Sequence, residues 1–308
     1  MSGSARTIAV EMTGGLGNQF FQYAAARALA MRWGTEPVFD VRPFEHDVHS
    51  TPWKFQLDRF KIKGRVATAA DHALFGRGAY SKNRALRKIQ RAIDRWTPGN
   101  GIVYREKHGA FVFDEDIFYL APPALLVGYW QSEKYFKPIR SELLSELELR
   151  APLSPAPQAI LRDIRKSPRP VSVHVRRGDY VSNPKAARFH GQCSLRYYEE
   201  AMGKMRAQFP DAQFFIFSDD IAWCRDHIRA GSSPVTYVDA DSPDKSLAEL
   251  MLMKACSHHI TANSSFSWWG AWLCVHAGQT VIAPRRWVVD PATMVKDVVP
   301  ETWIRIEN

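Results

Sequence analysis

The sequence lacks the features of secreted and membrane-spanning proteins. Its four cysteines, Cys193, Cys224, Cys256 and Cys274, lie far apart and form no CxxC pair. This spacing disfavours disulfides and a zinc site and favours reduced thiols. No run reaches the roughly 18 apolar residues of a membrane span, and the first residues lack the layout of a signal peptide. We therefore expect a cytoplasmic protein, or one whose membrane anchor is missing from this sequence.

Acidic residues are in deficit. The 308 residues include 41 Lys and Arg against 32 Asp and Glu, a formal net charge of +9. Such an excess suits anionic partners: nucleotides, nucleic acid or a membrane surface. Hydrophobic residues make up 45% and charged residues 24%, which is the composition of a globular protein. The length suffices for two domains of ordinary size.

The positive charge is densest in residues 77–96, which hold seven basic residues and one acid, Asp94. Leu86, Ile89 and Ile93 fall on one face of the helix predicted there. A basic amphipathic helix can lie on an anionic membrane, which would place the protein peripherally on its inner face. More often such a helix docks on its own domain, and both interpretations stay open.

The third glycine of a dinucleotide-binding fingerprint is also missing. Residues 7–13 predict a strand, residues 14–20 (GGLGNQF) a glycine turn and residues 21–34 a helix. This order opens a Rossmann-like unit. However, Phe20 stands where the third glycine would pack the helix against the strand, so the fingerprint fails.

Other polar residues of this first part suggest a ligand only weakly. Asp40 ends the strand-like run PVFDV, where a dinucleotide-binding protein would have its ribose-binding acid. Asn18 and Gln19 could hydrogen-bond a hydroxyl-rich ligand or simply cap the helix. Residues 124–130 predict a further strand, and residues 131–136 lead into a helix.

Proline clusters at residues 150–158 (RAPLSPAPQ), as is typical of a linker. The predicted domains are therefore 1–150 and 151–308. Beyond the linker, strands alternate with helices, which favours a parallel, doubly wound sheet. The strands are predicted at residues 171–175, 213–220, 235–241 and 258–264, with the last strand at 280–287.

Polar side chains gather at three predicted strand ends of the second domain. They are His174, Arg176, Arg177 and Asp179; then Ser218, Asp219 and Asp220; then Asn263, Ser264, Ser265 and Ser267. Singly, these clusters could be an arginine–aspartate turn and ordinary helix capping, with Asn263 as the cap. Because parallel strands end at one edge of a sheet, the clusters can converge there. Guanidinium groups and a helix N-terminus bind phosphate, so jointly they indicate a nucleoside-diphosphate ligand.

Five stretches, in this order, resemble the α-1,2-fucosyltransferases of glycosyltransferase family 11. They are GGLGNQFFQY (14–23), HVRRGDY (174–180), FSDD (217–220), NSSFSWWGAWL (263–273) and KDVVPETWIRI (296–306). The resemblance runs almost end to end, and HVRRGDY with NSSFSWWGAWL is specific. It implies an α/β, GT-B fold of two Rossmann-like domains facing a central cleft. It also implies transfer of L-fucose, with inversion, from GDP-β-L-fucose to the 2-hydroxyl of a terminal β-galactoside.

The same resemblance assigns the domains and their residues. The second domain would bind GDP-fucose through Arg176, Arg177, Ser218, Asp219, Asn263, Ser264, Ser265 and Ser267. Arg176 would contact the donor diphosphate, whereas Arg177 would pair structurally with Asp179. The first domain would bind the acceptor, a galactose-containing oligosaccharide or glycolipid, with Gly15, Gly17, Asn18 and Gln19 facing the acceptor and the fucose. Loops within residues 41–101 would set acceptor specificity.

The predicted catalytic residues are Arg176, Asp179 and His174. Asp179, His174 and Glu11 are alternative general bases, and the sequence does not choose among them. No cofactor and no nucleic-acid partner are expected. Residues 114–116 and 239–241 match the D-x-D pattern of metal-dependent transferases. We still expect no metal, because Arg176 and the serine-rich helix start can neutralise a diphosphate.

Three other functions stay open at this stage. A transferase could use GDP-fucose to form another linkage, such as α-1,6. An oxidoreductase could bind a dinucleotide in the glycine turn of residues 14–20, although the missing third glycine argues against it. A non-catalytic adhesion protein could use the Arg-Gly-Asp tripeptide at residues 177–179, although that signal belongs on an exposed loop tip.

Overall fold

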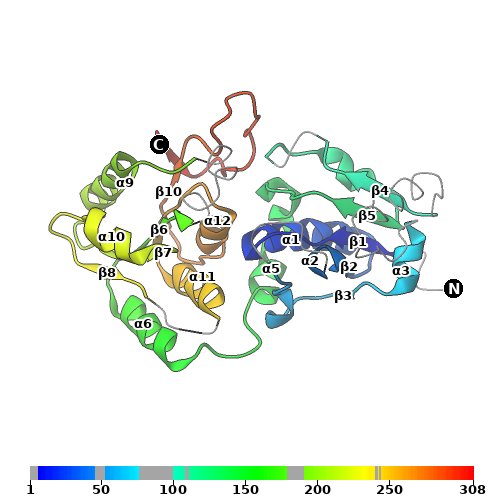
Figure 1. Cartoon of the computed structure of the whole chain (residues 1–308), viewed down its shortest axis with the longest axis horizontal. Coiled ribbons are helices and arrows are strands. Elements are labelled where there is room, and N and C mark those ends of the chain that lie inside the picture. Colours follow the sequence, from blue (N-terminus) through cyan, green and yellow to red (C-terminus); the bar gives the residue numbers. More distant parts are fainter. Residues whose placement is uncertain are drawn as a thin grey trace. The chain divides into compact units, whose positions relative to one another are not determined.

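The computed structural model describes residues 6–45, 53–75, 100–107, 111–178, 191–239, 242 and 244–308. The chain divides into two compact units, Met1–Arg150 with Lys296–Val298, and Ala151–Val295 with Val299–Asn308. Each unit has one parallel sheet whose strands alternate with helices (Figure 1). No helix in the described part of the chain is long and apolar enough to cross a membrane. The predicted basic helix at 77–96 lies outside the described residues, so its membrane contact and the cytoplasmic location stay predictions.

The first sheet has the strand order β3-β2-β1-β5-β4, and all its pairs are parallel. The strands are β1 (Ile8–Glu11), β2 (Pro37–Asp40), β3 (Arg65–Val66), β4 (Ile102–Arg105) and β5 (Ala124–Val127). The central strands β1 and β5 are short apolar runs that are almost wholly buried, as expected of a sheet covered on both faces.

The predicted strand, glycine turn and helix at the start of the chain are confirmed. Helix α1 (Leu16–Arg32) follows β1 through Gly14, which has a φ of +75°, where a glycine is favoured. Phe20, at the position of the missing glycine, is fully buried and meets the ring of Phe60 edge-on at 4.9 Å. The large side chain therefore fills a packing space in place of the close contact that glycine would allow.

The remaining helices in the described part of the first unit are short. The helix predicted from residues 131–136 begins as two 3-10 turns, η4 (Glu133–Tyr135) and η5 (Lys137–Ile139), and continues as α5 (Arg140–Glu146). The other helical segments are α2 (Arg42–Glu45), η2 (Leu57–Arg59), α3 (Ala69–Leu74) and η3 (Glu115–Tyr119).

The second sheet has the order β11-β10-β9-β6-β7-β8, again with parallel pairs throughout. The strands are β6 (Pro170–Val175), β7 (Gln213–Ser218), β8 (Val235–Tyr237), β9 (His258–Ile260), β10 (Val281–Pro284) and β11 (Ile304–Ile306). The prediction that residues 280–287 form the last strand is wrong, because β11 adds to β10 with Ile282 opposite Ile304. A three-residue strand with an arginine at its centre is too short to show a period.

The helices among the described residues of the second unit are α6 (Pro155–Lys166), α9 (Leu195–Gln208), α10 (Ile221–His227), α11 (Lys245–Ala255) and α12 (Ser265–Trp272). Helix α6 corrects the linker, since the proline-rich stretch 150–158 becomes helical at Pro155. Proline is tolerated at the start of a helix because its missing N–H has no intrahelical partner there. The core packs Tyr197, Tyr198 and Met202 of α9 against the apolar side chains of β6 and β7.

A buried ion pair joins the first and last helices of the first unit. Glu146 of α5, which is 6% exposed, accepts hydrogen bonds from the Tyr23 hydroxyl and from Arg27, whose Nη2 lies 2.8 Å from Oε1. The Tyr23 hydroxyl also accepts the backbone N–H of Lys63 at 3.1 Å. A carboxylate taken out of water needs such compensation.

Replacing Glu146 should therefore destabilise the first unit. Glu146→Gln leaves Arg27 without its counter-charge in a poorly solvated place, and we expect the free energy of unfolding to fall by about 3 kcal/mol. The matched variant Glu148→Gln removes an exposed partner of Lys61 and should cost less than about 1 kcal/mol. Urea denaturation of both variants measures the difference, and equal losses would contradict this reading of the buried pair.

Candidate functional site

Two of the predicted clusters meet at the carboxyl edge of the second sheet. Register pairs Val175 of β6 with Ser218 of β7, so the residues that follow these strands are neighbours. The Nη1 atom of Arg176 lies 2.9 Å from Oδ2 of Asp219. The backbone N–H of Arg177 donates to the other oxygen, Oδ1, at 2.8 Å. Asp219 thus orients the arginine and the turn that carries it.

Gly178 allows this close approach. A Cβ atom on Gly178 would lie 2.9 Å from Oδ2 of Asp219 and 3.0 Å from its Cγ. Any side chain there would push the carboxylate away from Arg176. The glycine of HVRRGDY is therefore explained by crowding against the neighbouring strand end.

Arg177 is anchored to the protein. Its guanidinium carbon lies 3.7 Å from the centre of the Trp223 ring, and its Nε lies 3.3 Å from Oδ2 of Asp220. Asp220 also caps α10 by accepting the N–H of Trp223, while Ser218 accepts the N–H of Asp220. The predicted partner of Arg177, Asp179, lies outside the described residues.

His174 is buried beneath this edge. Its ring lies 5.6 Å from that of Phe266 in α12, and its Nδ1 has no hydrogen-bond partner among the described residues. Burial lowers the pKa of His174 to about 4, against the opposing charge of Asp219 and with the help of Arg176. The imidazole is neutral at neutral pH and is a weak base there.

The third cluster divides into buried and accessible residues. The cap of α12 is Ser264, whose Oγ accepts the N–H of Phe266, and not Asn263 as the sequence suggested. Asn263 is 2% exposed and donates to the carbonyls of Gly191 and Trp287, both at 3.2 Å. Buried Ser267 donates to the carbonyls of the turn before α12. Ser264 and Ser265 are only half-buried and keep an open face.

The sequence analysis missed Glu249 of α11. This carboxyl is 8% exposed, and its Oε1 makes no hydrogen bond within the described residues, with Lys245 Nζ at 3.8 Å. Burial raises the pKa of Glu249 to about 7; Lys245 opposes the shift, and the nearby charge of Asp219 adds to it. An acid within the apolar run SLAELMLM was the available signal.

In the first unit, the glycine turn and the start of α1 carry two predicted polar site residues, Gln19, which is buried, and Asn18, which is partly exposed. Gln19 is fully buried: its Nε2 donates to the carbonyls of Gly14 and Lys54, and its Oε1 accepts the N–H of Gln56. Gly15 is the N-cap of α1, and Gly17 is buried within it. Asn18 is half-buried, and its Oδ1 accepts a hydrogen bond from Gln131 at 2.9 Å.

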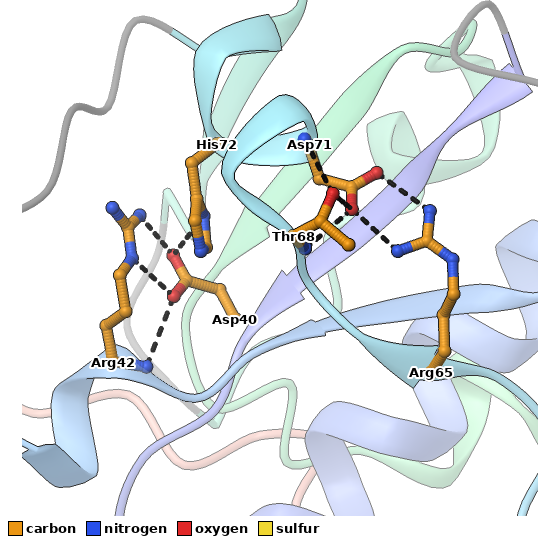
Figure 2. A network of polar contacts seen from close by, with 6 residues as sticks. All are labelled: Asp40, Arg42, Arg65, Thr68, Asp71 and His72. Atoms are coloured by element: carbon orange, nitrogen blue, oxygen red, sulfur yellow. Dashed lines mark hydrogen bonds and ion pairs between the residues drawn. The ribbon is translucent and has the colours of Figure 1, made fainter.

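Asp40, at the end of β2, forms an ion pair with Arg42 (Figure 2). Arg42 donates from Nε to Oδ1 at 2.8 Å and from Nη2 to Oδ2 at 2.7 Å. Burial opposes ionisation, but the hydrogen bonds and charge of Arg42 keep the pKa of Asp40 below its usual value. Beside it, Asp71 pairs with Arg65 and forms a capping box with Thr68 at the start of α3. These contacts hold residues 40–42 and 65–71 in place, at the start of and within residues 41–101, where the acceptor loops are predicted.

The D-x-D stretches are engaged by neighbouring side chains. Asp114 accepts the Tyr104 hydroxyl at 2.7 Å, and Asp116 pairs with Lys107 at 2.5 Å. Asp239 lies 3.5 Å from Lys245, and Asp241 lies outside the described residues. Across the part of the chain that the structure describes, no group of three His, Cys, Asp or Glu side chains could hold a metal ion.

Comparison with known proteins identifies the family. The family model for glycosyl transferase family 11 matches residues 114–307. The alpha-1,2-colitosyltransferase of Escherichia coli is 31% identical over 98% of this chain and 99% of its own length. The chain belongs to glycosyl transferase family 11. A galactoside alpha-(1,2)-fucosyltransferase 2 of Sus scrofa is 27% identical over 97% of this chain and 79% of that protein.

Solved structures support the fold. NodZ alpha-1,6-fucosyltransferase, soaked with GDP-fucose, matches with a TM-score of 0.51 at 17% identity, over 87% of this chain and 93% of that chain. A mutant of Arabidopsis thaliana FUT1 in complex with GDP matches with a TM-score of 0.51 at 10% identity, over 97% and 76%. The predicted α/β, GT-B class with two Rossmann-like units is confirmed.

Proposed function

We propose that this protein is an inverting transferase that moves L-fucose from GDP-β-L-fucose to the 2-hydroxyl of a terminal β-galactoside. The observation that carries the proposal is the Arg176–Asp219 pair at the ends of two neighbouring parallel strands. In open α/β sheets this edge is where ligands bind. The α-1,2 linkage named for several relatives supports the choice of hydroxyl.

The second unit would hold the donor. Arg176, oriented by Asp219, would contact the diphosphate, and Ser264 and Ser265 at the start of α12 would add hydroxyl and backbone N–H donors. We assign Glu249 to the nucleoside, because a buried carboxylate oxygen without a hydrogen bond suits ribose hydroxyls or guanine N–H groups. Three further side chains would hold these residues in position through their contacts within the protein: Arg177, Asn263 and Ser267.

The reaction follows from this arrangement. The 2-hydroxyl oxygen of the acceptor attacks the anomeric carbon from the face opposite GDP, the bond to the diphosphate oxygen breaks, and the β-linkage becomes α. Negative charge grows on the leaving diphosphate, and a fixed guanidinium there lowers the barrier directly. The hydroxyl proton passes to a base. The low pKa of His174 makes it the weakest of the three candidates, which leaves Asp179 and half-buried Glu11.

A second donor has support from a specific relative. The 31% identical protein is named for colitosyl transfer and matches almost the whole chain. Colitose is the 3-deoxy analogue of L-fucose, so GDP-L-colitose would present the same diphosphate and the same face of the sugar. Whether this chain prefers fucose or colitose then depends on contacts with a single hydroxyl group.

The central experiment is a panel of donors and acceptors. We expect transfer from GDP-L-fucose to β-galactosides, with NMR of the product showing an α-1,2 linkage. GDP-L-colitose in place of GDP-L-fucose tests the second candidate. An α-1,6 product would contradict the linkage, and absence of transfer from either donor would contradict the proposed function.

Arg176 should be required for turnover. Lysine keeps the charge but loses the planar fork that fits a diphosphate, so Arg176→Lys should lose most of the activity. Arg176→Ala should lower kcat by about two to three orders of magnitude. Arg169→Lys is the matched control, because Arg169 is an exposed arginine of the same unit, 3.4 Å from Asp211. Near-native kcat in a folded Arg176→Ala protein would refute the assignment.

Catalysis should not need a divalent metal. Arg176 and the N-terminus of α12 would neutralise the leaving diphosphate, which is the role of the ion in metal-dependent transferases. Initial rates should therefore stay nearly unchanged in excess EDTA. Loss of activity in EDTA, with recovery on adding Mn²⁺ or Mg²⁺, would instead favour an acidic metal site at Asp239 and Asp241.

A further inference from the structure

The turn after β5, residues 128–131 (GYWQ), has an unfavourable backbone. Trp130 has a φ of +58°, in the left-handed region that bulky residues rarely occupy. Its side chain is fully buried, edge-on to Tyr135 at 5.6 Å and nearly parallel to Tyr104 at 6.3 Å. A residue stays in such a conformation only when its surroundings hold it, and this kind of strain is concentrated at functional sites.

Glu106, directly after β4, holds this turn. Its Oε2 accepts the backbone N–H of Tyr129 at 2.8 Å, and its Oε1 accepts that of Trp130 at 2.9 Å. The approach is close, since a Cβ atom on Gly128 would lie 2.6 Å from Cβ and 2.7 Å from Oε2 of Glu106. One carboxylate therefore fixes two successive peptide groups, including that of the strained residue.

The held turn reaches the glycine turn of β1 in two places. Gln22 of α1 donates to the carbonyl of Gly128 at 3.1 Å and accepts the N–H of Thr13 at 3.0 Å. Gln131, the last residue of the GYWQ turn, donates from Nε2 to Oδ1 of Asn18 at 2.9 Å. Only the amide oxygen of Asn18 can accept this bond, so its Nδ2 group is turned towards Gly14.

We propose that Glu106 is a positioning residue that, through the GYWQ turn and Gln131, fixes the amide of Asn18 as a hydrogen-bond donor to the bound sugar. This inference rests on the proposed transferase function, in which Asn18 faces the acceptor and the fucose. Without the carboxylate the turn relaxes, Gln131 shifts, and the Asn18 amide is free to rotate. A small displacement of a group that orients a substrate costs up to about 100-fold in rate.

The protonation state of Glu106 supports the same role. Burial raises the pKa of Glu106 to about 7; the N–H groups of Tyr129 and Trp130 oppose the shift, and the charge of Asp114 adds to it. Only the carboxylate can accept both N–H groups, so transfer should weaken as pH falls through this value. Other titratable groups at or near this turn are Tyr104, Lys107, Tyr129, Tyr135 and Glu11.

A double-mutant cycle tests the proposal. In Glu106→Gln, the amide oxygen can still accept one of the two backbone N–H groups. The NH₂ group, a donor, then faces the other N–H, and that hydrogen bond is lost. We expect kcat/KM for the acceptor to fall about 10- to 100-fold. In an Asn18→Ala background the same change should cost less than about twofold, because Glu106 acts through Asn18. At saturating donor, where the proposed contact of Glu249 with the nucleoside is already formed, the fall in kcat/KM for the acceptor below the pKa of Glu106 should be smaller in Glu106→Gln than in wild type, and GDP affinity by calorimetry should be unchanged.

Two further variants keep the test decisive. Gln131→Ala breaks the link without touching Glu106, so it should reproduce the loss and its dependence on Asn18 even if Glu106→Gln folds poorly. Glu115→Gln changes an exposed acid of the same unit and should leave kcat/KM as in wild type. Equal losses with and without Asn18, or an unchanged kcat/KM in both variants, would overturn the positioning role. Failure of the proposed function would show instead in the wild-type protein, as absence of transfer from either sugar nucleotide.

Discussion

Parallel pairing is the constraint on which both units depend. Every strand pair in the two described sheets is parallel, so all strands of a sheet end at one edge. The inner strands β1, β5, β6 and β7 are mostly buried apolar runs, and polar residues follow them. This is why Arg176, after β6, lies beside Asp219, after β7, although 43 residues separate them in the sequence. In the first unit the same geometry brings Glu106, after β4, to the turn after β5.

The two units use this proximity in the same way. In each, a carboxylate at one strand end accepts backbone N–H groups of the turn that follows the neighbouring strand, and a glycine in that turn leaves room for it. Asp219 accepts the N–H of Arg177 and crowds Gly178, while Glu106 accepts two N–H groups and crowds Gly128. A carboxylate that accepts N–H bonds fixes a turn more rigidly than van der Waals packing alone. Rigid turns are what a site needs if it is to present side chains in one orientation.

The sequence predicted the parts of this arrangement that depend on local pattern. Apolar runs and glycine turns predicted the central strands of both sheets and the first helix, and the order of strands and helices predicted that the clusters of Arg176 and Asp219 converge. It failed where the outcome depends on neighbours in space. Gln19 and Asn263, which the sequence predicts to contact ligands, also hydrogen-bond nearby backbone atoms, and no local pattern reveals those partners. Residues 304–306 are recognised as strand β11 only because they pair with β10. The partners of Glu106 are set by the sheet order, which no local pattern encodes.

Among the described residues, several buried carboxylates are paired with arginine, as Asp40 is with Arg42 and Glu146 with Arg27. Glu106 and Glu249 differ, since burial raises the pKa of each to about 7. Holding an acid in this state costs folding free energy, because burial disfavours its charged form. Buried acids with shifted pKa values gather at functional sites for this reason. The two residues belong to different units, Glu106 after β4 of the first and Glu249 in helix α11 of the second, so each unit contains an acid whose burial opposes stability. That distribution is expected if both units, and not only the one proposed to bind the nucleotide, contribute side chains to the proposed reaction.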